Sequence, residues 1–174
     1  GLADGASETI VVDGTTIALG ANSSGTTATN GMAYTVTIVS GTATVALTKT
    51  AGVSTSAINT LINGITYQDT NTDNPTAGSR TFTLTQIQDS GGTANSGADT
   101  TTLSVVSTVA VNAVNDAPTL SATASNPTFT EAAGLGTQAA AVAVFSGANT
   151  STIESGQTIK GLTYLLHIGW KRLC

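Results

Sequence analysis

Residues 34–48 read Tyr-Thr-Val-Thr-Ile-Val-Ser-Gly-Thr-Ala-Thr-Val-Ala-Leu-Thr, so apolar residues alternate with threonine on both sides of Ser40-Gly41. A period of two places the apolar side chains on one face of a strand and the threonines on the other. The branched Cβ of threonine packs on the pleated surface while its hydroxyl contacts water. A serine and a glycine between two such runs indicate a turn. The stretch therefore predicts two antiparallel strands joined by a tight turn.

The same pattern recurs along the chain, which indicates an all-β fold. Threonine makes up 35 of the 174 residues, and aromatic residues only 4 %. Alternating or apolar runs predict strands at residues 9–12, 16–19, 65–67, 81–87 and 101–114. Asp13-Gly14 lies between the first two runs and predicts a hairpin turn. The alternation slips within the last run, which predicts a bulge there.

One segment departs from the strand pattern. Residues 57–62 carry apolar side chains at helical spacing, the hydroxyl residues 54–56 precede them, and Gly64 follows. A hydroxyl N-cap and a glycine stop are the usual ends of a helix. We therefore expect one short crossover helix in an otherwise β domain.

The charge pattern excludes several classes of protein. The chain has ten acidic and five basic residues and a net charge of −5, and charged residues make up 9 % of it, against about 25 % in an average soluble domain. This balance argues against a nucleic-acid partner. No run approaches about 18 consecutive apolar residues, so we expect no membrane insertion. A single cysteine excludes an intramolecular disulfide framework and a cysteine-rich zinc module.

The best boundary between domains is Val-Asn-Asp-Ala-Pro-Thr at residues 114–119, where a long strand ends and a proline fixes the backbone. New short strands are expected beyond it, at residues 128–131, 141–145 and 159–164. The last ten residues, Leu-Leu-His-Ile-Gly-Trp-Lys-Arg-Leu-Cys, hold the only histidine, tryptophan and cysteine of the chain. We therefore divide the chain into residues 1–118, residues 119–164 and a compositionally discordant tail at residues 165–174.

The boundary carries a family resemblance. Val-Asn-Ala-Val-Asn-Asp-Ala-Pro-Thr-Leu at 111–120 resembles the junction between cadherin-like tandem repeats of large bacterial surface adhesins, the RTX-type proteins with VCBS-type repeats. Residues 61–111 are similar to the second half of such a repeat, and residues 126–134 resemble the first strand of the next. The resemblance covers about residues 1–164. It implies an immunoglobulin/cadherin-like antiparallel β-sandwich, in which residues 1–118 are the later part of one repeat and 119–164 the opening strands of the next.

If the repeat begins and ends in this way, the first domain lacks strands and has an unpaired sheet edge. Two hypotheses follow. Residues 119–164 either fold back to supply the missing strands, as in a circular permutant, or pair with a second copy by strand exchange. A fold-back requires the junction to return along the length of the domain, so exchange is physically easier.

Oxygen ligands suggest calcium as a cofactor. The loop at residues 69–74 reads Asp-Thr-Asn-Thr-Asp-Asn, and Ca²⁺ prefers oxygen ligands of this kind. The resemblance adds acids near the repeat junction as ligands and one asparagine as a carbonyl donor. The alternative for each residue is an Asx turn that satisfies backbone N–H groups without a metal. The predicted metal ligands are Asp69, Asp73, Asp89, Asn115, Asp116 and Glu131.

The remaining charged residues have simpler interpretations. Glu8 and Glu154 are expected to be solvated strand residues. Arg80 is almost the only base of the first domain, and we expect it to pair with a neighbouring carboxylate such as Asp69 or Asp73 rather than to bind a substrate. His167 and Cys174 lie in the discordant tail, so the sequence predicts no nucleophilic enzyme.

Two functions follow from the sequence. The first is a structural, calcium-stabilised extension repeat of a bacterial cell-surface or secreted adhesin, with neighbouring repeats of the same chain as its partners, an extracellular location and no catalysis. The second is a carbohydrate- or protein-binding β-sandwich module at the tip of an adhesin. Binding loops of a tip module are expected to carry tryptophan, tyrosine or arginine, and the loops of this chain have almost none.

Overall fold

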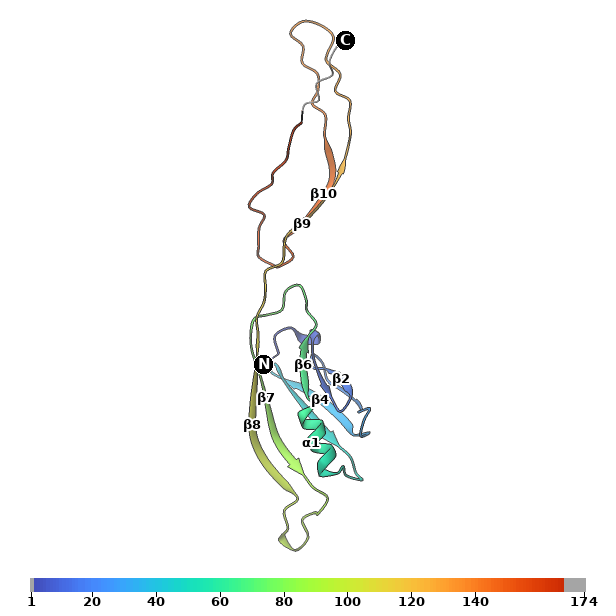
Figure 1. Cartoon of the computed structure of the whole chain (residues 1–174), viewed down its shortest axis with the longest axis vertical. Helices are drawn as coiled ribbons and strands as arrows, with labels where there is room; N and C mark the ends of the chain where they lie inside the picture. The colour runs from blue at the N-terminus through green and yellow to red at the C-terminus, as the bar shows by residue number, and fades with distance from the viewer. Residues whose placement is uncertain (1, 168–174) are drawn as a thin grey trace. The chain divides into compact units, whose positions relative to one another are not determined.

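The computed structural model describes residues 2–167 and is mostly β, with 40 % strand, 9 % helix and several antiparallel sheets (Figure 1). The prediction of an all-β chain is therefore confirmed at this level. The chain forms two compact units, unit 1 at Gly1–Val114 and unit 2 at Asn115–Cys174. The division falls inside the stretch 114–119 in which the sequence places a boundary. Each unit is described by itself.

The first sheet of unit 1 contains three antiparallel strands in the order β2-β1-β6. They are β1 (Glu8–Val12), β2 (Thr15–Ala18) and β6 (Thr66–Asp69). A short 3₁₀ helix, η1 (Gly5–Ser7), precedes β1. Asp13 and Gly14, which connect β1 to β2, have φ values of 50° and 75°. Positive φ at both central positions is the requirement of a type I′ hairpin turn, so the predicted hairpin is confirmed.

The second sheet contains the alternating stretch at residues 34–48. Its order is β3-β4-β5, with β3 (Ser23–Thr26), β4 (Ala33–Val39) and β5 (Thr42–Thr48). All seven residues of β4 pair with β5 across Ser40-Gly41, where φ is 49° and 74°. The alternation and the turn therefore specify the hairpin as predicted.

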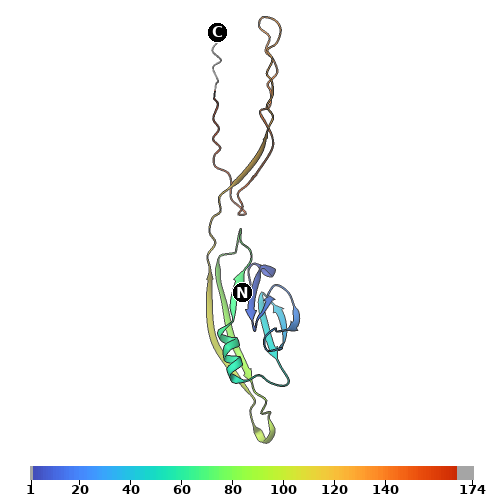
Figure 2. The same ribbon diagram turned by 45° about the vertical axis from the view of Figure 1, so that its right-hand side comes forward.

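The predicted helix is present as α1 (Thr55–Asn63). The Ser54 hydroxyl accepts a hydrogen bond of 3.2 Å from the Ala57 N–H and caps the first turn. Gly64 ends the helix, since its N–H bonds back to carbonyls of the last turn. Leu61 is the buried residue of the helix and packs into the core. Figure 2 shows the helix beside the strands of unit 1.

The third sheet of unit 1 is a two-stranded ribbon of β7 (Gly78–Gln88) and β8 (Thr100–Val111). The 3₁₀ helix η2 (Ala94–Ser96) lies in the loop between them. Leu84 pairs with Val105 and Gln86 pairs with Thr102, so β8 advances three residues where β7 advances two. The extra residue on β8 is the bulge that the slipped alternation predicts.

The core of unit 1 lies between the first two sheets and the helix. Its seven buried apolar residues are Ile10, Val12, Ile17, Leu19, Met32, Val36 and Leu61. From the β7–β8 ribbon, Phe82 is the residue that packs against this core. The ribbon therefore adds little to the apolar core that holds the other strands.

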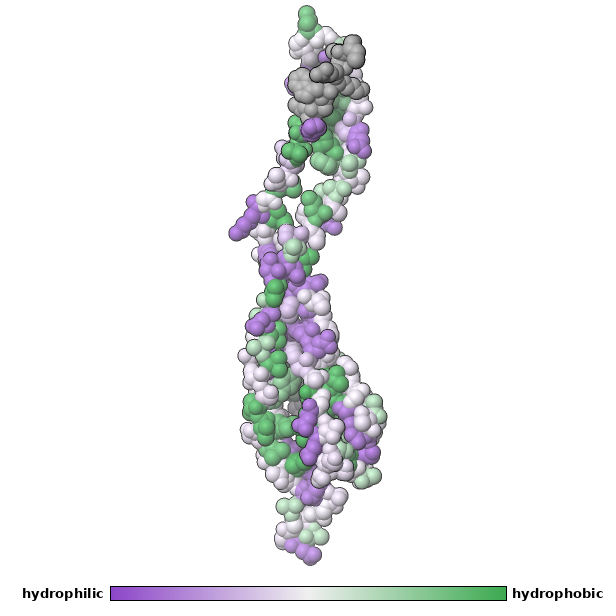
Figure 3. All heavy atoms as spheres, viewed as in Figure 1, coloured by the Kyte–Doolittle hydropathy of each residue, from purple (hydrophilic) through white to green (hydrophobic). Residues whose placement is uncertain are grey.

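Unit 2 contains one antiparallel pair, β9 (Thr119–Ala124) and β10 (Phe145–Ser151), with a register shift between Ser146 and Asn149. Residues 115–167 include no buried residue, and large apolar side chains lie on the surface of this unit (Figure 3).

The predictions for unit 2 are mostly wrong. The strands expected at residues 128–131 and 159–164 are absent, and the strand expected at 141–145 begins only at Phe145. A strand needs a partner ladder, and these segments have none in the described chain. Residues 165–167 of the predicted tail have no regular structure, and residues 168–174 lie outside the described residues.

Candidate metal centre

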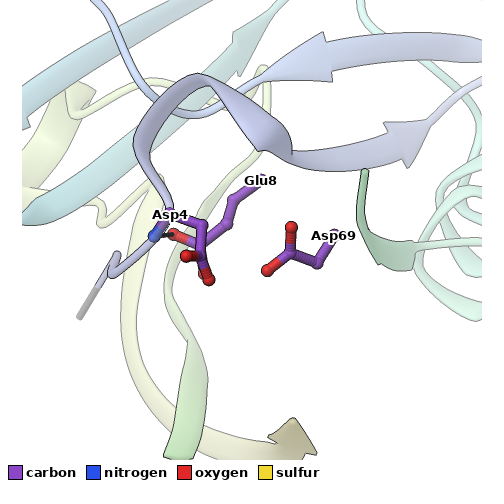
Figure 4. Close-up of side chains that lie close together, drawn as sticks. All are labelled: Asp4, Glu8 and Asp69. Atoms are coloured by element: carbon purple, nitrogen blue, oxygen red, sulfur yellow. Dashed lines mark hydrogen bonds between the residues drawn. The ribbon is translucent and has the colours of Figure 1, made fainter. Parts of the chain in front are cut away.

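Three carboxylates converge at one end of the first sheet (Figure 4). Asp4 lies just before η1, Glu8 begins β1, and Asp69 ends β6. Antiparallel pairing places Glu8 directly opposite Asp69, and the turn of η1 brings Asp4 back beside Glu8. One oxygen of each carboxylate lies within 4.8 Å of the others. Within residues 2–167 this is the one such group of three acidic or metal-ligating side chains.

Arg80 on β7 neutralises part of this charge. Its Nε donates to Glu8 Oε1, and its Nη2 donates to Asp4 Oδ2 at 3.0 Å and to the Thr76 carbonyl at 3.0 Å. The Arg80 side chain is 5 % exposed and that of Glu8 is 0 % exposed. Both ion pairs are therefore removed from water, and they join the start of unit 1 to a strand more than 70 residues later.

The expectation for Glu8 is wrong, because Glu8 is not a solvated strand residue. Arg80 does pair with carboxylates, as expected, but they are those of Asp4 and Glu8 rather than of Asp69 or Asp73. Residues at alternate positions of a strand share one face, so Glu8 lies on the same face of β1 as the buried Ile10 and Val12. That alternation was the signal in the sequence, and it marks Glu8 as an inward-facing acid.

Glu8 is fully hydrogen-bonded. Besides Arg80, it accepts from the Tyr67 hydroxyl at 2.9 Å and from the N–H groups of Ala3 and Asp4 at 2.8 and 3.3 Å. Burial raises the pKa of Glu8, but the bonds from Arg80, Tyr67 and Ala3 outweigh burial and hold this pKa below its ordinary value. Burial and the bond to Glu8 raise the pKa of Tyr67 to about 12.

Asp4 is also well satisfied. Its two carboxylate oxygens accept from the N–H and the hydroxyl of Thr76 at 2.9 and 2.7 Å. Burial raises the pKa of Asp4, and these hydrogen bonds lower it by more, so the net shift is downward. Asp4 and Glu8 therefore stay ionised at neutral pH.

Asp69 is different. Its Oδ1 accepts from the Asn71 N–H at 2.9 Å, whereas its Oδ2 is buried and has no hydrogen-bond partner. Burial raises the pKa of Asp69, and the neighbouring Asp4 and Glu8 raise it further against the bond from Asn71. Three carboxylates thus lie near one guanidinium. Arg80 pairs with Asp4 and Glu8, so the negative charge of Asp69 is the one without a counter-ion.

This arrangement favours a positive charge beside Asp69. Either a proton or a cation lowers the free energy of a carboxylate that faces two others. Carboxylate oxygens are the ligands that Ca²⁺ prefers, and the three acids would supply part of the six to eight oxygens it takes. The donor types therefore suit calcium. The oxygens of Glu8 and Asp4 already accept hydrogen bonds, and Oδ2 of Asp69 is the oxygen of the cluster without a partner.

The structure places the other predicted ligands of unit 1 outside this cluster. Asp73 is exposed in the loop after β6 and accepts from the Thr72 hydroxyl at 3.1 Å. Asp89 is exposed at the end of β7, where its carboxylate accepts from the Gly91 N–H at 2.7 Å. The second contact is the Asx turn that was the alternative to metal binding.

In unit 2, Asn115 and Asp116 meet residues that follow β10. Asn115 Oδ1 accepts from Gln157 Nε2 at 2.7 Å, and the Asp116 N–H donates to the Glu154 carboxylate. Glu154 is half-buried in a bend, so the expectation of a solvated strand residue is wrong. Glu131 is exposed. Calcium binding at Asp73, Asp89, Asn115, Asp116 and Glu131 stays a prediction.

Asp13 is a second buried acid of unit 1. Its carboxylate accepts from the Thr27 hydroxyl at 2.5 Å and from the N–H and Nδ2 of Asn30 at 2.9 and 2.5 Å. Burial raises the pKa of Asp13. These hydrogen bonds and the charge of Lys49 lower this pKa by more than burial raises it, so the net shift is downward. Asp13 therefore anchors the loop between β3 and β4 onto the first hairpin.

Comparison with protein-family models, with curated proteins and with solved structures found no match. No helix within residues 2–167 is long and apolar enough to cross a membrane.

Proposed function

We propose that this chain is a structural, calcium-stabilised extension repeat of a bacterial cell-surface or secreted adhesin. Its location would be extracellular, its partners would be neighbouring repeats, and its role in cell adhesion would be mechanical rather than catalytic. The proposal rests on the resemblance of residues 111–120 and 61–111 to cadherin-like repeats and on the antiparallel β structure of the chain. The finer fold proposed is an immunoglobulin/cadherin-like sandwich.

The observation that carries the calcium part of the proposal is the Asp4–Glu8–Asp69 cluster, with the unpartnered buried oxygen of Asp69. A cation bound there would tie the segment before β1 to the end of β6. It would also remove the mutual repulsion of the three acids, so its binding free energy would add to the free energy of unfolding. Calcium concentration would thereby control the stiffness of the repeat.

Thermal unfolding with excess calcium and with chelator tests the proposal. We expect a higher midpoint in calcium, no such rise in sodium chloride of equal ionic strength, and no response to calcium in Asp69→Asn. The matched control is Asp73→Asn, which removes an exposed carboxylate from the following loop and should keep the response. Coincident midpoints for the wild-type chain would reject calcium, and loss of the response in Asp73→Asn alone would reject this cluster as the site.

A further inference from the structure

Strand β8 has a long edge without the usual protection. It runs over 12 residues, pairs with β7 on one side, and has no other partner in the described chain. At about 3.3 Å per residue it is roughly 40 Å long. Proteins commonly protect such an edge with charged residues or proline, and the sequence Thr-Thr-Thr-Leu-Ser-Val-Val-Ser-Thr-Val-Ala-Val has neither.

Two apolar side chains at the centre of this strand are also exposed. Val105 and Val106 occupy opposite faces at the centre of β8, and they are 59 % and 57 % exposed. Apolar side chains gather on the β7–β8 side of unit 1 (Figure 3). The ribbon thus presents both backbone groups and apolar surface to a further strand.

Unit 2 lacks a core instead: it has strands, but residues 115–167 include no buried residue. The eleven large exposed apolar residues of this range are Leu120, Phe129, Leu135, Val142, Val144, Phe145, Ile159, Leu162, Tyr164, Leu165 and Leu166. An isolated two-stranded hairpin is at best marginally stable in water. Unit 2 therefore needs a sheet to pack against.

We propose that two copies of this chain exchange these parts, so that the β9–β10 hairpin of each copy pairs with the β8 edge of the other. In such a dimer each β8 edge gains a paired strand, and the apolar residues of each unit 2 gain a surface to pack against. Both copies use the same two surfaces, as in a two-fold symmetric dimer. A standard interface buries about 800 Å² per partner, and the large apolar side chains of unit 2 other than Leu135, each at least 41 % exposed, supply surface on that scale. Direct pairing of two β8 edges would leave the apolar residues of unit 2 in water.

The segment between β8 and β9 contains no two-residue hairpin turn. Residues 112–118 contain no glycine and no residue with positive φ, and the two-residue I′ and II′ hairpin turns require positive φ. Pro118 also holds Ala117 in an extended conformation. A return of β9 to the β8 edge of its own chain would therefore need a wider reversal than a two-residue hairpin.

Size-exclusion chromatography with light scattering of the full chain, in chelator so that calcium plays no part, tests the exchange. We expect a mass of twice 17.2 kDa that falls toward 17.2 kDa on dilution. Val105→Lys places a charge on the accepting edge and should give a monomer. The control Val39→Lys alters a valine of similar exposure, 65 %, on the central strand β4 and should leave the dimer intact.

The donating side is tested in the same way. The double variant Leu120→Lys, Phe145→Lys should also be monomeric, whereas Leu135→Lys, in a turn, should dimerise. Far-ultraviolet circular dichroism establishes that each monomeric variant keeps its β content. Mixing the Val105→Lys variant with the double variant should restore a dimer, because the first still donates a hairpin and the second still offers an edge.

Three results would overturn the proposal. A wild-type mass of 17.2 kDa at every concentration would exclude exchange. A dimer that tolerates the Leu120→Lys, Phe145→Lys change would indicate edge-to-edge pairing of β8. Failure of the two folded variants to form a dimer on mixing would show that hairpin and edge do not meet.

Discussion

Glu8 shows how unit 1 accommodates an acid on the inward face of a strand. A buried carboxylate is costly unless it is paired and hydrogen-bonded, and Glu8 has a guanidinium, a phenol and two backbone N–H groups around it. Asp69, directly opposite on β6, has the N–H of Asn71 and a second oxygen without a partner. The free-energy cost of burying three carboxylates together therefore falls mainly on Asp69.

Asp69→Asn should raise the thermal midpoint of the calcium-free protein at pH 7. The pKa of Asp69 is raised in the folded state, so its contribution to stability is fully present below the unfolded pKa of about 3.9 and is lost as pH rises through the folded pKa. The asparagine is neutral at every pH and removes that loss. Melts in chelator between pH 7 and pH 3.5 measure the effect, and the advantage of the variant should vanish at the acidic end.

The control for this prediction is Asp73→Asn, which should leave the calcium-free midpoint unchanged at both pH values. A lower midpoint for Asp69→Asn in chelator at pH 7 would show that the ionised Asp69 stabilises the fold. Burial and the repulsion from Asp4 and Glu8 would then not be the dominant effects on its charge.

The pKa shift of Asp13 has the opposite direction to that of Asp69. Its pKa is lowered in the folded state, so its contribution to stability is present above the unfolded pKa of about 3.9 and is lost as pH falls through the folded pKa. Asp13→Asn should reduce the free energy of unfolding by about 2 kcal/mol at pH 7, because hydrogen bonds to a charged group are lost. Urea unfolding should show that the difference from wild type shrinks at pH 3. A difference independent of pH would mean that the charge of Asp13 is irrelevant.

At the scale of elements, local features were predictable and distant ones were not. The hairpins at Asp13-Gly14 and Ser40-Gly41 and the helix capped by Ser54 each depend on residues that are close in sequence. The pairing of Arg80 with Glu8 spans 72 residues and depends on which strands become neighbours. Of the candidate site, the sequence pointed to Asp69 but not to Asp4 or Glu8, although the alternation in β1 marked Glu8 as inward-facing.

In unit 2, apolar patterns predict strands that the structure does not contain. Val142 and Val144 belong to an apolar run that is typical of a strand, yet residues 141–144 form none. A period of two specifies which face of a strand is apolar, but it does not supply the neighbouring strand that the backbone must bond to. Phe145 begins β10 because Ala124 of β9 lies opposite it.

Arg80→Met should reduce the free energy of unfolding by about 3 kcal/mol, because Glu8 is left buried without its counter-ion. The double variant Glu8→Gln, Arg80→Met should cost less than the sum of its two single changes, since neither charge then remains unpaired. Lys160→Met, which removes an exposed positive charge from unit 2, is the control. Additive effects in urea unfolding would contradict a direct ion pair.

The helix cap gives a smaller effect. Ser54→Ala should cost about 1 kcal/mol, because the Ala57 N–H loses its acceptor. Ser56→Ala lies in the first turn of the same helix, is exposed, and should be nearly neutral. Equal costs for the two changes in chemical unfolding would show that the hydroxyl of Ser54 does not cap α1.

At the scale of the whole molecule, the two units differ in what can oppose their conformational entropy. Ordering a residue costs about 1–2 kcal/mol for the backbone alone, and burial of apolar surface is the main term against it. Unit 1 buries seven apolar residues in one cluster, and residues 115–167 of unit 2 bury none. Unit 1 therefore has a folding core of its own, whereas unit 2 would depend on the proposed exchange with a second copy for one.

Limited proteolysis should show this dependence directly. Chymotrypsin cleaves after large apolar and aromatic residues, and Phe129, Phe145 and Tyr164 of unit 2 are 57 %, 62 % and 81 % exposed. In the monomeric Val105→Lys variant these sites should be cut first and leave a stable fragment close to residues 1–114. In the wild-type dimer they should be protected, because pairing with a second copy closes the open states that a protease needs.

Mass spectrometry of the timed digests identifies the fragments, and Val39→Lys serves again as the matched control that keeps the dimer. Protection that falls on dilution of the wild-type chain would tie it to association rather than to the intrinsic stability of unit 2, since only a bimolecular contact depends on concentration. Equal digestion of the wild type and of Val105→Lys at every concentration would instead mean that the β8 edge does not protect unit 2 from cleavage. The apolar residues of unit 2 would then stay in water in the native protein.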